Sequence, residues 1–141
     1  MGIANLLILA SLTAIPSRSP INGLLSSEYG IRISPFTQQE AFHQGIDIVA
    51  PLETPIYAPA NGIVVCICKN KRLGNFVIID HGNGITSKYG HVMKILVKYG
   101  QPIAMGSQIA SVGMTGRTTG SHLHYEILVN GKNVDPRKFI F

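Results

Sequence analysis

Charged residues are scarce in this 141-residue sequence, in which Asp, Glu, Lys and Arg together make up 13%. Because 45% of the residues are hydrophobic, the chain can bury a core, and an intrinsically disordered protein is excluded. The length suits one compact domain and is too short for two. Tryptophan is absent, and the sequence has only two cysteines. Two neighbouring cysteines give no support to a structural zinc site built from cysteine.

A long hydrophobic run is also missing. A helix that crosses a bilayer needs about 20 apolar residues, and the apolar part of the opening stretch, MGIANLLILASLTAIPSRSP, is shorter. No Lys or Arg precedes that apolar part, so it makes a poor signal peptide. We expect residues 1–20 to form a short N-terminal helix and a linker, with Pro16 and Pro20 ending the helix. No membrane span is expected, and the abrupt start suggests a piece of a longer exported or membrane-anchored protein.

Acidic residues are outnumbered by basic ones. The chain has 12 Lys and Arg against 7 Asp and Glu, which gives a net charge of +5 and a pI near 9.4. This excess suits an anionic partner such as a nucleic acid, a lipid surface or an acidic wall polymer. The basic residues are scattered, however, and only Lys69, Lys71 and Arg72 cluster. Nucleic-acid binding is therefore not expected, because it needs a denser basic stripe with stacking aromatics.

Sustained helical periodicity is absent after residue 15, and short segments rich in Val, Ile and Tyr take its place. These segments are bounded by turn residues and predict strands. They are residues 29–34, 45–50, 54–58, 62–69, 74–80, 84–91, 108–113 and 122–130. DHGNG (80–84) and VNGKN (129–133) predict tight hairpins, since Gly and Asn accept positive φ. We therefore expect residues 21–141 to form a single, mostly β, antiparallel sandwich or barrel-like domain.

The two cysteines, Cys66 and Cys68, occupy alternate positions of one predicted strand. Their side chains would point to the same face, about 6.6 Å apart at ~3.3 Å per residue. We therefore expect no disulfide between them, and interpret both as small apolar strand residues.

Two of the five histidines, His122 and His124, share one face of the last long predicted strand. Both imidazoles could bind one metal ion, or one could be a ligand and the other a neighbouring acid or base. A purely structural role, with one ring buried and the other exposed, is equally compatible with the spacing. His81 lies within the DHGNG hairpin, where hydrogen bonding in the turn is the expected role.

A second pattern, H-x-x-x-D, places His43 and Asp47 in FHQGIDIVAP. In an extended strand their Cα atoms would be about 13 Å apart, so they could share an ion only if the chain bends between them. Gly45 is the residue that permits such a bend. Two histidines and one carboxylate around an open position form a catalytic rather than a structural zinc arrangement. His91, in YGH, would by itself be interpreted as a surface residue.

Taken in order, HQGID (43–47), YGH (89–91) and HLHYE (122–126) resemble the lysostaphin-type, or LytM-like, zinc metallopeptidases, which cut peptide cross-links of bacterial peptidoglycan. The resemblance covers residues 16–141 and implies the LytM fold, an antiparallel domain with a duplicated hybrid motif. It implies one Zn²⁺ per chain, held by the metal ligands His43, Asp47 and His124. His91 and His122 would be catalytic, acting on the attacking water or on the oxyanion.

The resemblance also implies a partner and a location. The substrate would be a peptide stem or bridge of peptidoglycan, reached outside the cytoplasm in the periplasm or cell wall. Of the two bonds cut within the family, we favour the direct D-alanyl–diaminopimelate link over the glycine bridge. A homologous or regulatory protein partner is compatible with this function. The sequence departs from the family at Glu53, where Gly is usual, and at Val92 and Ser121, where Leu and Pro are common.

Two alternatives remain. A module of the same fold could bind the wall or activate a partner hydrolase without catalysis, although the intact set of five site residues argues against it. The pattern of strand and turn residues in 62–112 also resembles that of carrier domains and of the IIA domains of sugar phosphotransferases. A IIA domain would need no H-x-x-x-D pattern, and a carrier would need a Lys at its hairpin tip.

Overall fold

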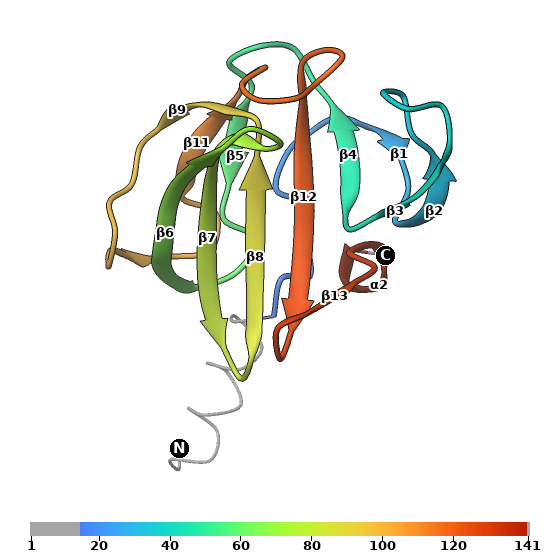
Figure 1. Cartoon of the computed structure of the whole chain (residues 1–141). Helices are drawn as coiled ribbons and strands as arrows, with labels where there is room; N and C mark the ends of the chain where they lie inside the picture. Colours follow the sequence, from blue (N-terminus) through green and yellow to red (C-terminus); the bar gives the residue numbers. More distant parts are fainter. Residues whose placement is uncertain (1–14, 141) are drawn as a thin grey trace, which may run out of the picture.

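The computed structural model describes residues 15–140 (Figure 1). The helix predicted at the start of the chain falls mainly on residues 1–14, which lie outside the described part. The strands are β1 (Leu24–Ser27), β2 (Gly30–Ile33), β3 (Glu40–His43), β4 (Ile46–Val49), β5 (Pro55–Tyr57), β6 (Gly62–Asn70), β7 (Gly74–Gly82), β8 (Ile85–Gly90), β9 (Val92–Ile95), β10 (Pro102–Ile103), β11 (Gln108–Val112), β12 (His122–Val129) and β13 (Lys132–Val134); one short helix, α2, spans Arg137–Ile140. No helix within residues 15–140 has the length and hydropathy needed to cross a membrane.

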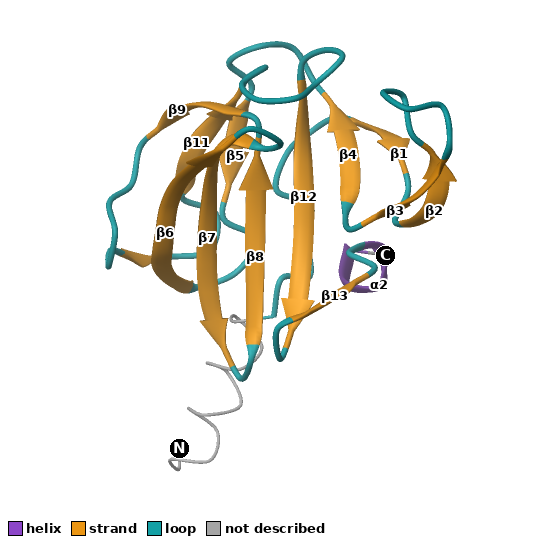
Figure 2. Ribbon diagram, viewed as in Figure 1, coloured by secondary structure: helices purple, strands orange, loops and turns teal. Residues whose placement is uncertain are grey.

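The strands form three antiparallel sheets. The largest has eight strands in the order β1-β4-β12-β8-β7-β6-β10, with β13 also paired to β12. A three-stranded sheet, β5-β11-β9, lies behind it, and β2 and β3 form a separate hairpin (Figure 2). The buried core joins the two larger sheets, since it includes residues of β4, β7, β8 and β12 together with residues of β5, β9 and β11. The predicted mostly β, antiparallel fold is confirmed.

Strand β12 shows how the sequence places the site. Leu123, Tyr125 and Ile127 are fully buried in the core, and burial of an aliphatic side chain such as Leu123 or Ile127 stabilises the fold by about 1.5–3 kcal/mol. Because side chains alternate along a strand, the intervening His122, His124 and Glu126 must face the other side. The apolar residues thus fix the direction in which the polar ones point.

Both predicted hairpins are present. The β7–β8 turn contains Asn83 at φ +53° between two glycines of positive φ, and the β12–β13 turn has Asn130 at +51° followed by Gly131 at +79°. The sequence patterns missed the short strands β1, β3, β9, β10 and β13 as well as α2. These elements have two to four residues each, too few to show a period.

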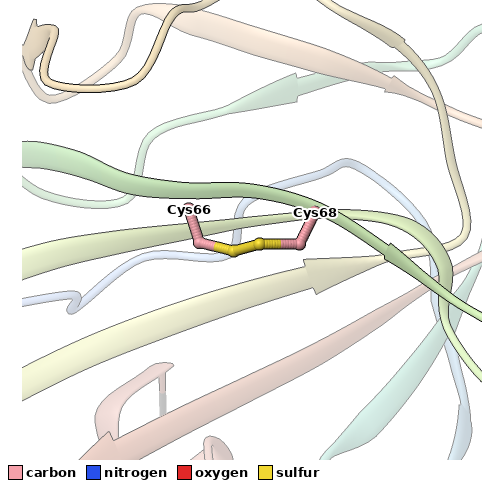
Figure 3. The surroundings of a disulfide bond; sticks show 2 residues. All are labelled: Cys66 and Cys68. Carbon is pink, nitrogen blue, oxygen red and sulfur yellow. A yellow bond between two sulfur atoms is a disulfide. The ribbon is translucent and has the colours of Figure 1, made fainter.

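The expectation that Cys66 and Cys68 stay unpaired is wrong. Their sulfur atoms are bonded, and the bridge lies along β6 (Figure 3). The two Cα atoms are 5.7 Å apart, which is shorter than in a fully extended strand and within the usual range for a disulfide. The register between β6 and β7 shifts between Val64 and Cys66, and such a bulge bends the strand locally.

His81 has a structural role, but its ring does not bond within the turn as predicted. Its ring is buried, with Nδ1 2.7 Å from the carbonyl oxygen of Asn61 and Nε2 2.6 Å from Oγ of Ser87. These bonds tie β7 to β8 and to the turn before β6. Burial lowers the pKa of His81, which favours the neutral ring in this position.

Candidate metal centre

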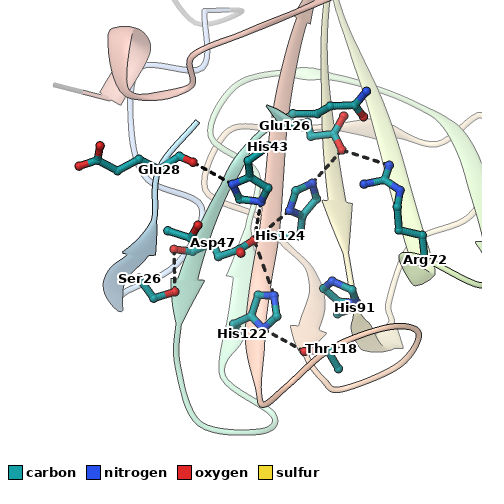
Figure 4. Close-up of polar contacts among 12 residues, drawn as sticks. Ser26, Glu28, His43, Asp47, Arg72, His91, Thr118, His122, His124 and Glu126 are labelled. Carbon is teal, nitrogen blue, oxygen red and sulfur yellow. Dashed lines mark hydrogen bonds and ion pairs between the residues drawn. The ribbon is translucent and has the colours of Figure 1, made fainter. Parts of the chain in front are cut away.

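The five residues predicted for the site come together along a groove of about 830 Å³. His43 ends β3, Asp47 lies in β4, His91 follows β8, and His122 and His124 begin β12. All five are among the residues that line the groove. Figure 4 shows His91 and His122 on one side of the site and Glu126 on the other. Groove loops come from the β2–β3 hairpin and from the connection between β11 and β12.

Three of the five can hold a metal ion together. One donor atom each from His43, Asp47 and His124 lie within 4.8 Å of one another, and all three residues are buried. Oδ1 of Asp47 is 2.9 Å from Nδ1 of His124 and 3.3 Å from Nε2 of His43. Asp47 and His124 are directly opposite each other in the β4–β12 pairing, which fixes this approach. Two imidazoles and one carboxylate with an open side fit a catalytic zinc site.

The bend between His43 and Asp47 occurs where the sequence predicted it, although for another reason. The chain breaks between β3 and β4 at residues 44–45. Gly45 has no left-handed backbone; instead, a Cβ at this position would collide with the carbonyl oxygen of Tyr125. Glycine is therefore needed because β12 passes close to the bend.

Outer hydrogen bonds orient both ligand rings. The carbonyl oxygen of Glu28 lies 2.9 Å from Nδ1 of His43, and a carboxylate oxygen of Glu126 lies 2.8 Å from Nε2 of His124. An N–H at each of these positions can donate, and the second nitrogen of each ring, Nε2 of His43 and Nδ1 of His124, faces Asp47. Metal-binding histidines commonly have such a partner on the second nitrogen.

Charges around Asp47 hold it ionised. Burial opposes its charged form, but hydrogen bonds from His124 and His43 outweigh burial and lower the pKa of Asp47 well below its ordinary value. Nη1 of Arg32 adds a contact of 3.3 Å to the other carboxylate oxygen and also donates to Ser27. The group is thus a ready anionic ligand at any physiological pH.

His122 lies beside the donor set. Its Nε2 is 3.6 Å from Oδ1 of Asp47, whereas its Nδ1 is 3.0 Å from the carbonyl oxygen of Gly120 and 3.1 Å from Oγ1 of Thr118. Donation from Nδ1 to the Gly120 carbonyl directs an unprotonated Nε2 toward the site. A residue with this geometry can accept a proton there.

His91 is buried rather than at the surface, and its ring centre is 4.8 Å from that of His122. Nδ1 is 2.7 Å from the carbonyl oxygen of Thr115, which it can reach as a donor. The backbone of His91 has φ +62°, a strained conformation that sets the ring into the groove floor. Burial lowers the pKa of His91 to about 4, so the ring is neutral near pH 7.

The chain matches peptidase family M23 over residues 41–136, about two thirds of its length. It belongs to that family. The M23 domain is 44% identical over 107 residues to peptidoglycan DD-endopeptidase ShyA of Vibrio cholerae serotype O1, covering 76% of this chain and 25% of the relative. It is 44% identical to ShyC of the same organism over 122 residues, covering 85% and 28%. The chain thus spans about a quarter of the length of these curated relatives.

Solved structures show the same fold. A zinc-containing peptidase from Vibrio cholerae superposes on the M23 domain with a TM-score of 0.79 and 36% identity, covering 84% of this chain and 38% of the other. The catalytic domain of lysostaphin from Staphylococcus simulans gives a TM-score of 0.76 at 27% identity, covering 84% and 92%. The M23 domain therefore has the lysostaphin-like fold that the sequence motifs implied.

Two residues of the candidate site were missed by sequence reasoning. Glu126 accepts hydrogen bonds from His124 and, at 2.7 Å, from the side-chain amide of Asn133. Burial opposes its ionisation, but the His124 bond outweighs burial and lowers the pKa of Glu126 to about 2. The signal for Glu126 was present, since it lies two residues after His124 on the same strand face. No sequence pattern indicated Arg32, because it reaches Asp47 from a separate hairpin.

Proposed function

We propose that this chain is a zinc-dependent endopeptidase domain that hydrolyses peptide cross-links of bacterial peptidoglycan. The observation that carries the proposal is the donor set of His43, Asp47 and His124, with two further histidines at its open side and a groove in front. A purely structural metal site would need neither the open side nor the extra rings.

Bound zinc would act as a Lewis acid and lower the pKa of its water to about 7, which supplies a nucleophile near neutral pH. His43 and His124 would bind through Nε2 and Nδ1, and Asp47 through Oδ1. His122 can accept a proton from the attacking water at Nε2, because its Nδ1–H donates to the Gly120 carbonyl on the other side of the ring. The proton can then pass to the leaving amine.

His91 has a separate part in this mechanism. Its pKa of about 4 keeps the ring neutral, so it adds no positive charge beside a cationic metal. The Thr115 carbonyl fixes the ring orientation, and contact with the His122 ring restricts where that base can move. The two histidines thus replace the glutamate base of other zinc peptidases.

The relatives and the groove support one class of substrate. ShyA and ShyC are named peptidoglycan DD-endopeptidases, which supports the direct cross-link between stems over a glycine bridge. Because peptidoglycan lies outside the cytoplasmic membrane, the domain would act in the periplasm or cell wall. The groove, open along the β2–β3 hairpin and the β11–β12 loop, can accept an extended peptide.

Metal content and cleavage of muropeptides test this function. We expect the purified chain to hold one zinc and to release monomeric stems from cross-linked peptidoglycan. His124→Ala should lose both the metal and the activity, whereas His122→Ala should keep the metal and lose the rate. His81→Asn, at a buried histidine outside the site, serves as the matched control and should retain zinc.

Each opposite result has a clear meaning. A folded chain that binds zinc but cleaves no peptidoglycan would favour a wall-binding or hydrolase-activating module of the same fold. A chain that binds no zinc at micromolar concentrations would refute the proposed function outright. Loss of zinc in His122→Ala would refute the division of roles between His122 and His124.

A further inference from the structure

We infer that Arg72 and Arg117 form a carboxylate-binding subsite on one wall of the groove, which selects anionic peptide stems over uncharged bridges. The inference rests on the proposed function, because it names the substrate class of the same groove. It concerns residues that no metal-binding pattern includes: Arg72 follows β6 in the turn to β7, and Arg117 lies in the connection from β11 to β12.

The charge of the groove lining favours an anion. Three arginines are among its lining residues, and the single acidic residue among them, within residues 15–140, is the proposed metal ligand Asp47. Arg32 is already engaged by that carboxylate at 3.3 Å and by Ser27. Arg72 and Arg117 are therefore the cations left to meet a ligand.

Arg117 is held in place without neutralisation. Its guanidinium carbon lies 4.1 Å from the centre of the Phe36 ring, so the group stacks on an aromatic face across the groove. In the described part of the chain, no carboxylate lies within ion-pair distance of Arg117. A stacked guanidinium keeps its N–H edge available for two parallel hydrogen bonds to a carboxylate.

Arg72 has only a distant counter-charge. Its Nη2 is 3.8 Å from a carboxylate oxygen of Glu126, and half of the Arg72 side chain is exposed (Figure 4). The Glu126 carboxylate already receives shorter bonds of 2.8 Å from His124 and 2.7 Å from Asn133. The outer part of the Arg72 guanidinium can therefore bind a second anion.

The backbones of Arg72 and Arg117 are bonded to each other. The N–H of Arg117 donates to the carbonyl oxygen of Arg72 at 3.0 Å. Beside this bond, Gly74 and Gly116 have φ of +62° and +80°, and a Cβ on either would collide with the backbone of the opposite loop. The two loops are thus in direct contact, and the two arginines extend from adjacent backbone in the wall of the groove.

The same loops carry the groups that position the proposed catalytic histidines. The carbonyl oxygen of Leu73, next to Arg72, accepts the backbone N–H of His91 at 2.7 Å. Thr118, next to Arg117, contacts Nδ1 of His122. A carboxylate on the arginines would therefore be anchored beside the scissile bond. Stems with diaminopimelate carry free carboxylates near the direct cross-link, whereas glycine bridges carry none.

The test compares two probes: a synthetic dimer of stem peptides, joined through diaminopimelate with its carboxylates free, and the same dimer with those carboxylates amidated. For the free acid, Arg117→Gln should raise KM at least about tenfold while kcat changes less than about twofold, because a charge-assisted contact is lost. Arg72→Gln should act in the same direction. For the amidated dimer, neither variant should change KM.

Lys71→Gln is the matched control, since it removes one positive charge from the same turn at an exposed residue that does not line the groove. It should leave both probes unaffected, whereas Arg117→Lys should restore part of the preference. Equal losses on both probes in Arg117→Gln, or no preference for the free acid in the unsubstituted chain, would overturn the subsite.

A binding measurement separates this inference from the proposed function. Calorimetry on zinc-loaded His122→Ala should give tighter binding of the free acid than of the amide, and adding Arg117→Gln should abolish the difference. If the unsubstituted chain cleaves neither dimer but this difference is found, the proposed function fails and the subsite stands. Cleavage of both dimers without preference, together with equal binding, refutes the subsite alone.

Discussion

Glu126 provides the sharpest prediction, because the residue is buried beneath the proposed metal ligand His124. Its side chain is 1% exposed and accepts bonds from His124 and Asn133 while Lys88 lies 3.7 Å away. Glu126→Gln preserves the shape of the side chain. It replaces one of the two carboxylate oxygens, which now accept from His124 and Asn133, by an amide nitrogen that cannot accept. We expect the variant to bind zinc 10- to 100-fold more weakly, the usual effect of losing an outer partner of a ligand histidine.

The magnitude for the metal-free protein follows from the pKa. Glu126 titrates near 2 in the fold against an ordinary value of 4.5, and each unit corresponds to 1.36 kcal/mol, so its ionised form stabilises the protein by about 3 kcal/mol. A lowered carboxyl pKa contributes stability above pH 4.5 that is lost as the pH falls toward 2. Between these pH values, urea unfolding should show a loss of stability that is about 3 kcal/mol larger in the wild type than in Glu126→Gln.

The zinc affinity can refute the reasoning. The zinc dissociation constant is obtained by competition with a chromophoric chelator, and Glu28→Gln is the control. The Glu28 side chain is exposed and pairs with Arg137, whereas its backbone carbonyl, which holds His43, is unchanged by the substitution. A Glu126→Gln variant with the same zinc affinity as Glu28→Gln, within about twofold, would show that the carboxylate does not orient His124.

Three further predictions concern other parts of the chain. Glu53 has φ +69°, so Glu53→Gly should relieve left-handed strain and raise the free energy of unfolding by up to about 1 kcal/mol; Glu53→Ala should give no gain in the same thermal unfolding assay. In metal-free protein, NMR should find the His91 ring neutral down to about pH 4. Because the unfolded chain binds this proton at a higher pH than the folded chain, the free energy of unfolding should fall between pH 6.5 and 4. His91→Asn should remove the contribution of His91 to that decrease. Changing Cys66 and Cys68 to Ser opens a loop of only three residues and should cost at most about 2 kcal/mol in urea unfolding, without affecting zinc binding.

The sequence was a good guide wherever local patterns decide the structure. Alternation along β12 correctly placed His122 and His124 on one face, and the Asn-Gly pairs marked both hairpins. The left-handed backbone of Glu53 is a conformation that glycine adopts without strain, which fits the glycine that the family resemblance implied there.

Features that depend on distant contacts were beyond local patterns. His91 is buried because its ring reaches the carbonyl of Thr115, 24 residues later, from a strained backbone. Arg32 meets Asp47 through a hairpin whose strands have four residues each. The Cys66–Cys68 bridge forms in β6 just after a shift of its register with β7, a feature that depends on the partner strand. In each case the deciding partner lies on another element.

The alternation of β12 has a consequence for folding as well as for function. His122, His124 and Glu126 all depend on one register between β12 and β4, where His124 faces Asp47. A slip of one residue would turn all three side chains toward the core and their apolar neighbours toward water. A mispaired chain could not assemble the three donors, so an ion that binds them stabilises only the correctly paired strand. The metal ion that would serve the reaction would therefore also favour the correct strand register over the shifted one.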